Sequence, residues 1–401
     1  MQKSLRSPIA FLMALQFINW LGLAGWAALF NNFGKEAAGF GGYEIGIVQS
    51  VREIPGFLAF TAIAWFLIMR EQIFGVFSLV ILGFGCLLSG MFPTLGGVLM
   101  TTLLMSIGFH YAETVAQSLA LQIFPKAQAA QLLGKVASAG AVASMLGYGG
   151  MALMWWAGIR DYTVLFAILG CVCISLAIAA YFWFPRIEGT VPQRKTIVLR
   201  PRYWLYYALT FMSGARRQIF MAFAGFLLVE RFGFKVLDVA LLMLATAALT
   251  TLCAPIFGRV IGQIGERRTI MIENIGLIIV FAGYATTNDG RVAALLFVLD
   301  GLFMILLIAQ RTYFQKIGDA ADMSPTAAVA FTINHIAAVF IPFGFGILWI
   351  KNPALVFQAG GLIATLSLIL SFLVPHDPGP GQETVFKEQS DKNVGALQPG
   401  G

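Results

Sequence analysis

The sequence predicts an all-α integral membrane protein with twelve transmembrane helices in two six-helix halves. Of its 401 residues, 59% are hydrophobic and only 11% are charged, and the mean hydropathy is +0.82. A soluble domain carries about 25% charged residues. A chain with so few charges cannot cover a water-facing surface, so much of its surface must face lipid.

Twelve apolar stretches are long enough to cross a membrane, because about 20 apolar residues span the hydrocarbon core. Turn-forming residues separate them, among them Gly39, Pro93, Pro125 and Gly290. The predicted spans are residues 9–30, 44–68, 73–91, 95–113, 132–156, 162–184, 203–229, 237–259, 269–287, 292–308, 327–350 and 354–374.

The first span follows Lys3 and Arg6 and is too long for the core of a signal peptide, so we expect it to be retained. All four cysteines lie inside apolar stretches, which favours neither a disulfide framework nor a zinc site. We expect no metal and no cofactor.

The positive charges indicate the orientation of the chain. Most of the 26 Lys and Arg residues fall in segments on the N-terminal side of the membrane, such as Arg186 to Arg202, and few fall in the opposite loops. This asymmetry predicts a multi-pass protein of the cell (inner) membrane with both termini in the cytoplasm. The net charge of +7 is spread over short loops, so nucleic acid is not an expected partner.

The longest inner connection divides the spans six and six, a recurring plan in transporters. We expect an N-terminal half over residues 1–185, a basic cytoplasmic loop over 186–202 and a C-terminal half over 203–375. Residues 376–401 are rich in Pro, Gly, Gln and charge, so we expect a disordered cytoplasmic tail. The protein is expected to be a monomer.

The turn between the eighth and ninth spans resembles the signature of the major facilitator superfamily, Gly-x-x-x-Asp-(Arg/Lys)-x-Gly followed by three basic residues. Four residues match, namely Gly258, Gly265, Arg267 and Arg268. Gly262 stands where Asp is usual, and Gln263 and Glu266 replace basic residues. The twelve spans and their division into six and six also resemble this family, so the resemblance covers roughly residues 8–375.

The resemblance implies a secondary transporter that works by alternating access. In that fold, spans 1, 4, 7 and 10 line a central cavity, spans 2, 5, 8 and 11 assist, and the remaining four lie outside. The sequence agrees, since spans 3, 6 and 12 carry no charge between their ends and span 9 carries only Glu273 near its inner end.

Buried ionisable residues are the candidates for proton coupling, because such groups are costly in a membrane and are usually functional. His110 and Glu113 are three residues apart and share a helix face, where they can hold and release a proton or form a structural pair. Asp300 stands alone among apolar residues and must be protonated or paired. Glu53 is the fourth candidate; Arg52 and Glu53 are neighbours, so we expect each to pair with another helix.

Arg216 and Arg217 in span 7 are candidates for binding an anionic substrate, because a guanidinium pairs with carboxylate or phosphate through two hydrogen bonds. They lie about 100° apart on a helix, so at most one faces a cavity squarely. The arginines at 52, 216 and 217 are balanced by carboxylates at 53, 113 and 300, so internal salt bridges are the alternative.

Four further polar residues are substrate-binding candidates: Arg52, Asn19, Asn334 and His335. For the asparagines, a hydrogen bond between helices is the alternative.

The sequence therefore predicts a secondary active transporter of a small solute. We do not expect an enzyme, because no catalytic or ATP-binding motif accompanies the spans. Proton coupling is the first hypothesis. The alternative is a facilitative or exchange carrier for an organic anion held by the span-7 arginines. A non-transporting membrane enzyme or receptor is disfavoured. The expected partners are the small-molecule substrate, the lipid bilayer and protons.

Overall fold

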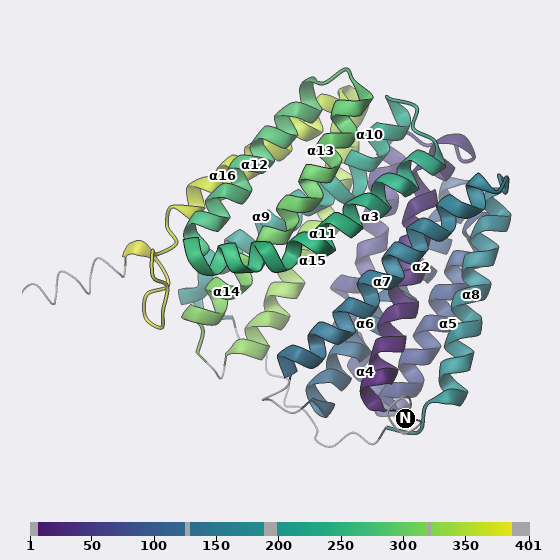
Figure 1. Cartoon of the computed structure of the whole chain (residues 1–401), viewed down its shortest axis with the longest axis horizontal. Coiled ribbons are helices and arrows are strands. Elements are labelled where there is room, and N and C mark those ends of the chain that lie inside the picture. Colours follow the sequence, from purple (N-terminus) through teal and green to yellow (C-terminus); the bar gives the residue numbers. More distant parts are fainter. Residues whose placement is uncertain (1–6, 125–128, 188–198, 320–321, 387–401) are drawn as a thin grey trace, which may run out of the picture. The chain divides into compact units, whose positions relative to one another are not determined.

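The computed structural model describes residues 7–124, 129–187, 199–319 and 322–386. Apart from turns and one isolated bridge between Gly379 and Gln382, the regular structure of these residues is helical (Figure 1). The chain divides into two compact units. Unit 1 contains residues 1–193 and 225–248, and unit 2 contains residues 194–224 and 249–401.

Unit 1 is a bundle of long helices in which α2 packs against α7 and α8, and α5 packs against α6 and α8 (Figure 1). The short helix α10 also packs against α2. The helices of unit 1 are α2 (Pro8–Glu36), α3 (Gly42–Phe57), η1 (Ala59–Thr61), α4 (Ala62–Ile68), α5 (Glu71–Ser89), α6 (Leu95–Ile123), α7 (Ala129–Trp156), α8 (Tyr162–Trp183), α10 (Gly225–Glu230) and the first part of α11 (Val236–Ile264).

Side-chain caps and glycines set the ends of these helices. The Ser7 hydroxyl accepts from the backbone of Ala10 at the start of α2, and Asp161 caps α8 in the same way. After α2, Gly39 has a φ of 68°, a left-handed conformation that glycine adopts without steric cost. The turn predicted at Gly39 is confirmed.

Close approach of α5 and α6 depends on two glycines. A Cβ on Gly85 would lie 2.2 Å from the backbone nitrogen of Met105, and a Cβ on Gly108 would lie 2.3 Å from that of Leu82. Without side chains at these positions the two backbones come into direct contact, as small residues allow in membrane helices.

Unit 2 has the same general plan, with α12 against α16 and α9 against α15 and α16. Its helices are η3 (Pro201–Tyr203), α9 (Trp204–Gln218), the π-helix η4 (Ile219–Ala224), the remainder of α11, α12 (Glu266–Thr286), α13 (Gly290–Phe303), η5 (Met304–Leu307), α14 (Ile308–Ile317), α15 (Met323–Lys351) and α16 (Pro353–Ser371).

An ionic cluster closes the end of unit 2 where α9 begins. Arg200 forms two hydrogen bonds with the carboxylate of Asp322, one of them 2.9 Å long between Nη2 and Oδ1. Arg202 pairs with Asp319, and the Tyr203 hydroxyl donates to Asp322 over 3.1 Å. These contacts tie the start of α9 to the connection between α14 and α15.

The chain beyond α16 folds back onto unit 2. The backbone nitrogen of Val385 donates to the Leu373 carbonyl over 3.0 Å, the Tyr313 hydroxyl donates to the carbonyl of Glu383, and Glu383 is buried. The polar composition of the predicted disordered tail gave no sign of these contacts at Glu383 and Val385. Residues 387–401 of the predicted tail and residues 188–198 of the predicted central loop lie outside the described residues.

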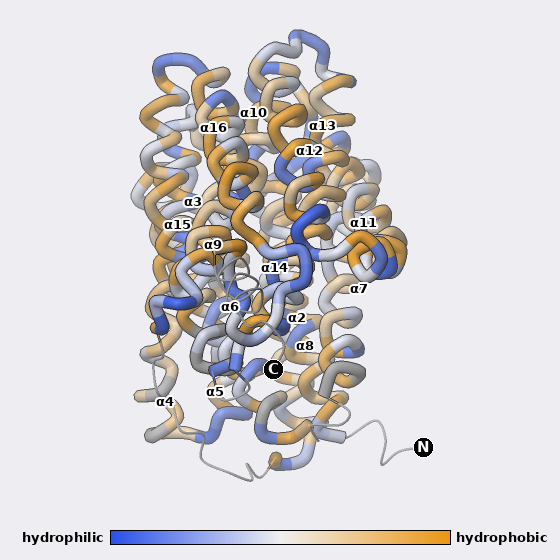
Figure 2. Tube along the Cα trace, turned by 90° about the vertical axis from the view of Figure 1, so that its left-hand side faces the viewer, coloured by the Kyte–Doolittle hydropathy of each residue, from blue (hydrophilic) through white to orange (hydrophobic). Residues whose placement is uncertain are grey.

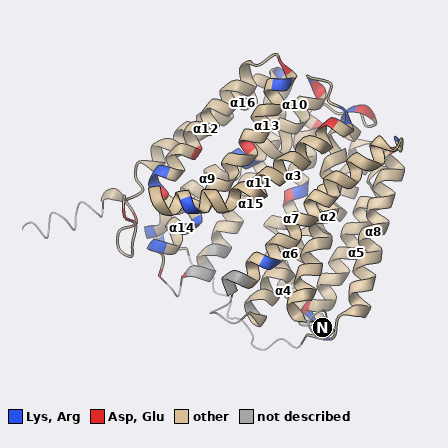
Figure 3. Ribbon diagram, in the orientation of Figure 1, with Lys and Arg blue, Asp and Glu red and all other residues tan. Residues whose placement is uncertain are grey.

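Ten helices among the described residues are long and apolar enough to cross a membrane. One of the ten, Gly290–Ile317, combines α13, η5 and α14. The other two predicted spans, 44–68 and 203–229, are each divided into shorter helices, which is consistent with twelve spans, and the exact count stays a prediction. Pro55 explains the first division, since its ring removes a backbone donor shortly before α3 ends at Phe57. Hydrophobic residues dominate the helices in Figure 2, and charges gather mainly at helix ends in Figure 3.

We predict that Gly85→Ala destabilises unit 1, because the added methyl group meets the backbone of Met105 rather than a flexible side chain. Such overpacking costs about 1–3 kcal/mol. The thermal unfolding midpoint in detergent measures the loss. Gly150→Ala on α7 is the matched control, since a Cβ there meets nothing within 4 Å; equal midpoints for the two variants would contradict the prediction.

A second prediction concerns Asp322, which precedes the membrane-crossing part of α15. Hydrogen bonds from Arg200 and Tyr203 outweigh burial and hold the pKa of the Asp322 carboxyl below its ordinary value of about 3.9. Its stabilising contribution is therefore complete above that ordinary value and is lost as the pH falls through the lower folded-state pKa. The wild type should unfold at a higher temperature than Asp322→Asn near neutral pH, and the difference should shrink below about pH 4. A difference that does not change with pH would show that this ion pair is not responsible.

Candidate functional site

In unit 1, Arg52 and Glu53 of α3 form a buried ion pair with each other. The Arg52 Nη2 and Glu53 Oε1 atoms are 2.6 Å apart, and each residue is no more than 6% exposed. We expected each of these neighbours to pair with another helix, and this direct pairing was not expected; the long, flexible arginine side chain allows the guanidinium to reach the carboxylate of the next residue. The Ser106 hydroxyl of α6 donates to the Arg52 carbonyl and joins α3 to α6.

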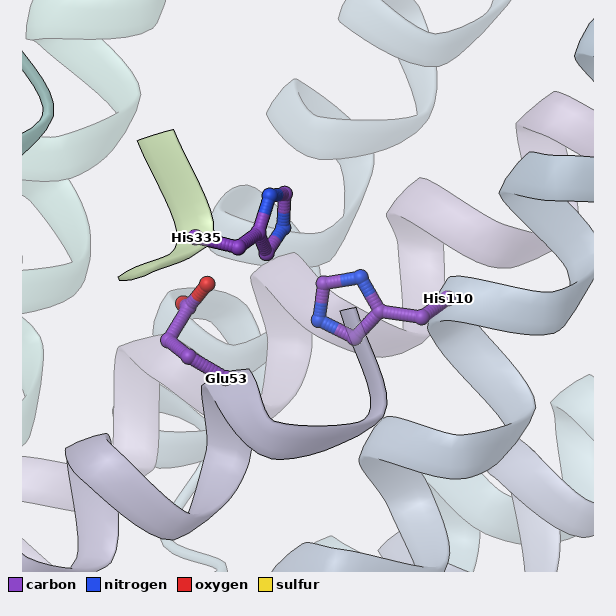
Figure 4. Close-up of side chains that lie close together, drawn as sticks. All are labelled: Glu53, His110 and His335. Atoms are coloured by element: carbon purple, nitrogen blue, oxygen red, sulfur yellow. The ribbon is translucent and has the colours of Figure 1, made fainter. Parts of the chain in front are cut away.

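The structure brings His110 of α6 to this ion pair. A ring nitrogen of His110 lies within 4.8 Å of a carboxylate oxygen of Glu53, and both side chains are buried. Figure 4 shows the Glu53 side chain on α3 and the His110 ring on α6 extending into the same region. The cluster thus contains one guanidinium, one carboxylate and one imidazole, the side chain whose unperturbed pKa lies closest to neutral pH.

Glu113, one turn further along α6, is held by amides. Gln16 of α2 donates to Glu113 Oε2 over 2.9 Å, and Gln117 donates to Oε1 over 3.3 Å. Asn19 of α2 donates to the Phe109 carbonyl over 3.2 Å. Asn19 therefore makes the hydrogen bond between helices that the sequence offered as the alternative to substrate binding, and these contacts join α2 to α6.

Two buried amide oxygens remain in this region of unit 1. Gln16 and Asn19 use their side-chain nitrogens for the bonds just described, and their oxygens have no donor among the described residues. A buried acceptor without a donor costs about 1–3 kcal/mol. These oxygens are therefore suited to accept hydrogen bonds from a bound molecule.

In unit 2, Arg216 of α9 is held by two side chains of α12. Its Nη2 atom lies 2.7 Å from Glu273 Oε1, and its Nη1 donates to Asn274 Oδ1. Asn274 donates its own amide to the Ile270 carbonyl over 2.7 Å, which turns its oxygen toward the arginine. Sequence reasoning missed Glu273 as a site residue. The signal was present, since Glu273 is the only charge in span 9 beyond its inner end.

Arg217 points to a different helix from Arg216, as the 100° helical offset requires. It donates to Asn334 Oδ1 of α15 over 2.8 Å. Gly214 allows the approach, because a Cβ there would lie 2.8 Å from Asn334 Nδ2. His335 is buried, and its Nδ1 lies 2.9 Å from the Phe331 carbonyl.

Asp300 of α13 is 2% exposed and interacts electrostatically with Arg216 and with the phenol of Tyr284. Its Oδ2 atom and the Glu273 Oε2 atom have no hydrogen-bond donor among the described residues. The sequence-based charge balance left out Glu273. With Glu273 included, Arg216 serves two carboxylates.

The signature turn between α11 and α12 is built around Gly265, whose φ of 81° favours glycine. Glu266, which departs from the signature, is buried and pairs with Lys316 of α14 at 2.9 Å. Arg267 is half-buried and Arg268 is exposed, and a Cβ on Gly258 would meet nothing within 4 Å. The ionic contact made by this turn therefore comes from Glu266 rather than from the matched basic residues.

Comparison with known proteins gives one family. The model of the Major Facilitator Superfamily matches residues 7–342. No curated protein sequence matches the chain significantly.

Several solved transporters share the fold. The nucleoside transporter NupG is 15% identical, with 91% of this chain and 98% of that chain covered and a TM-score of 0.71. A bacterial homologue of the human lysosomal transporter Spinster is 13% identical, with coverages of 92% and 96% and a TM-score of 0.70. A POT family transporter in complex with 5-aminolevulinic acid is 11% identical, with coverages of 91% and 95% and a TM-score of 0.75.

We predict that Arg216→Met destabilises unit 2 strongly, because it leaves buried carboxylates without their cation. Breaking a buried ion pair from one side costs about 3–5 kcal/mol. Arg217→Met is the matched control and should cost less, since Arg217 is only half-buried whereas Arg216 is 3% exposed. Thermal unfolding in detergent compares the two, and adding Glu273→Gln to Arg216→Met should restore part of the loss. Equal losses without any such recovery would refute the assignment.

Proposed function

Because the chain belongs to the Major Facilitator Superfamily and is a membrane transporter, we propose that it moves a small polar solute by alternating access with coupling to protons. Its placement in the cell (inner) membrane with both termini in the cytoplasm is part of the proposal and is supported by the distribution of Lys and Arg.

The observation that carries the proposal is the buried cluster of Arg52, Glu53 and His110 in unit 1. The Arg52–Glu53 pair is neutral, so a proton on His110 adds a net positive charge in a region of low dielectric. Moving that proton to Glu53 would neutralise the carboxylate and release Arg52 from it. A single proton therefore changes which charged groups attract each other, as coupling requires.

Glu113 is proposed as a second proton-carrying group. It lies on the same helix as His110 and is held by the amides of Gln16 and Gln117, so its charge state acts directly on α2 through Gln16. A proton on Glu113 would weaken the hydrogen bond from Gln16, since an ionised acceptor binds a donor more strongly than a neutral one.

The unused amide oxygens of Gln16 and Asn19 support a solute that carries N–H or O–H donors. Arg52, Asn19, Arg217, Asn334 and His335 remain proposed substrate contacts. Nucleosides, named in the description of one similar structure, are donor-rich solutes of this kind and are the first class to screen.

The anion alternative finds less support. It relied on the two arginines of span 7, and Arg216 is occupied by Glu273 and Asn274 inside unit 2. The alternative would therefore depend on Arg217 alone.

The proposal is tested in proteoliposomes containing a pH-sensitive dye, with uridine and adenosine as the first solutes. Wild-type protein should show solute-dependent proton flux. Glu53→Gln and Glu113→Gln should lose most of this flux, because an amide cannot take up and release the proton. Asp377→Asn, which changes an exposed carboxylate outside the membrane-crossing helices, is the matched control and should keep it.

Exchange of labelled for unlabelled solute separates coupling from binding. A variant that still exchanges solute but carries no proton has lost coupling alone. Normal proton flux in both Glu53→Gln and Glu113→Gln would overturn the residue assignment, and transport without any proton movement in the wild type would overturn proton coupling itself.

A further inference from the structure

A second buried charged cluster lies in unit 2, on helices α9, α12 and α13. It consists of Arg216, Glu273 and Asp300, none more than 3% exposed, and Asp300 also interacts electrostatically with the phenol of Tyr284. Arg216 pairs directly with Glu273 and interacts electrostatically with Asp300. The cluster therefore contains one permanent positive charge and two carboxyl groups.

The neighbouring elements do not supply a compensating cation through their described contacts. Helix α16 and η5 contain no ionisable residue. On α9, Arg217 bonds Asn334, and on α14, Lys316 bonds Glu266. Arg267 and Arg268 lie in the first turn of α12, where Arg267 is half-buried and Arg268 is exposed. Arg291 lies in the first turn of α13, and Nδ1 of His335 on α15 lies 2.9 Å from the Phe331 carbonyl. Arg311 of α14 is exposed.

Hydrogen bonding gives an independent indication. Glu273 Oε2 and Asp300 Oδ2 are both buried and have no donor among the described residues. A carboxylate oxygen is an acceptor only, whereas the same oxygen in a carboxylic acid carries its own proton and can donate. A cluster with one proton would have no net charge, and the cost of a buried, uncompensated negative charge would disappear.

We propose that Glu273 and Asp300 share one bound proton, that Arg216 stabilises whichever carboxylate is ionised, and that this cluster is a proton-binding site of unit 2, separate from the groups proposed in unit 1. The use of this proton in transport rests on the proposed function, but its presence in the protein does not. Asn274 is a positioning residue. Its Oδ1 accepts a hydrogen bond from Arg216, and its Nδ2 donates to the Ile270 carbonyl, which fixes the orientation of the amide.

The backbone around the cluster is irregular. The π-helix η4 begins at Ile219, three residues after Arg216, and the 3₁₀-helix η5 begins at Met304, four residues after Asp300. Such segments inside longer helices are frequent at functional sites. They give α9 and α13 places where a change of charge can be followed by a small change in the backbone.

Release of the proton is a simple acid dissociation. The carboxyl O–H bond breaks, its electrons stay on the oxygen, and a water molecule accepts the proton. Two carboxylates then share Arg216, so release is favourable only in a conformation that admits water to the cluster. Uptake reverses the step. Proton occupancy is thereby linked to the conformation of unit 2.

Infrared spectroscopy of the purified full-length protein tests the inference without any transported solute. The C=O stretch of a protonated carboxylic acid is separate from that of a carboxylate and shifts in D₂O. The wild type should show this band at about pH 7, where carboxyl groups with ordinary pKa values are ionised. Glu273→Gln and Asp300→Asn should each abolish the band of this cluster, because one carboxylate then remains to pair with Arg216.

The control variant Asp377→Asn should keep the band. A band that persists in both single variants, or a wild-type protein without one, would overturn the inference. Spectra recorded in choline chloride and in sodium chloride distinguish a proton from a metal cation, and loss of the band on adding sodium would overturn the proton assignment. Arg216→Met, if it folds, should strengthen the band because both carboxyls must then be protonated.

The result is separable from that of the transport assay. A band without proton-coupled transport would retain this site and refute the coupling proposed above. Coupled transport without the band would retain the coupling through unit 1 and refute this site.

Discussion

Ionised side chains inside a hydrocarbon bilayer need an opposite charge, a set of hydrogen bonds or a proton, and much of this protein follows from that constraint. Unit 1 places Arg52 against Glu53, and unit 2 places Arg216 against Glu273. Both pairs are buried within their own unit. Each arginine therefore acts first as the partner of a carboxylate of the protein, and any role toward a solute comes through changes in that pairing.

The same constraint relates the charges to interruptions in the helices. Glu53 lies two residues before Pro55, where α3 approaches its end, and Arg216 lies three residues before η4. A continuous α-helix fixes the directions of its side chains by regular hydrogen bonding, whereas a proline or a π-turn leaves backbone groups to be satisfied in more than one way. The charged residues are thus located where their helices can change shape at low cost. This placement suits groups whose partners change when a proton binds or leaves.

The apolar length and charge distribution of the sequence were sufficient to predict the fold, because bilayer thickness fixes the length of a spanning helix. They also located buried ionisable residues such as His110 and Asp300. They could not assign partners. Arg52 bonds its own neighbour, which depends on the rotamer of a long side chain, and Arg216 reaches Glu273 on a helix expected to lie outside the cavity.

Two further departures from the sequence analysis have a similar origin. Val385 and Glu383 accept or donate hydrogen bonds with Tyr313 and Leu373 through their backbone groups, and such bonds carry no signature in amino-acid composition. In the signature turn, Glu266 stands where the signature has a basic residue. It forms an ion pair with Lys316. In both cases the determining contact joins segments far apart in the chain.

Internal pairing of the arginines also bears on the charge of the transported solute. If Arg216 is held by carboxylates of unit 2, the protein has less need of an anionic solute to satisfy it, and the unused amide oxygens of Gln16 and Asn19 favour neutral hydrogen-bond donors. A neutral solute that crosses with one proton carries one net charge, and the membrane potential contributes about 2.3 kcal/mol per charge for each 100 mV. A singly charged anion that crosses with one proton carries none. The two substrate classes therefore differ in whether membrane voltage drives transport, which connects the pairing of a buried arginine to a property of the whole transport cycle.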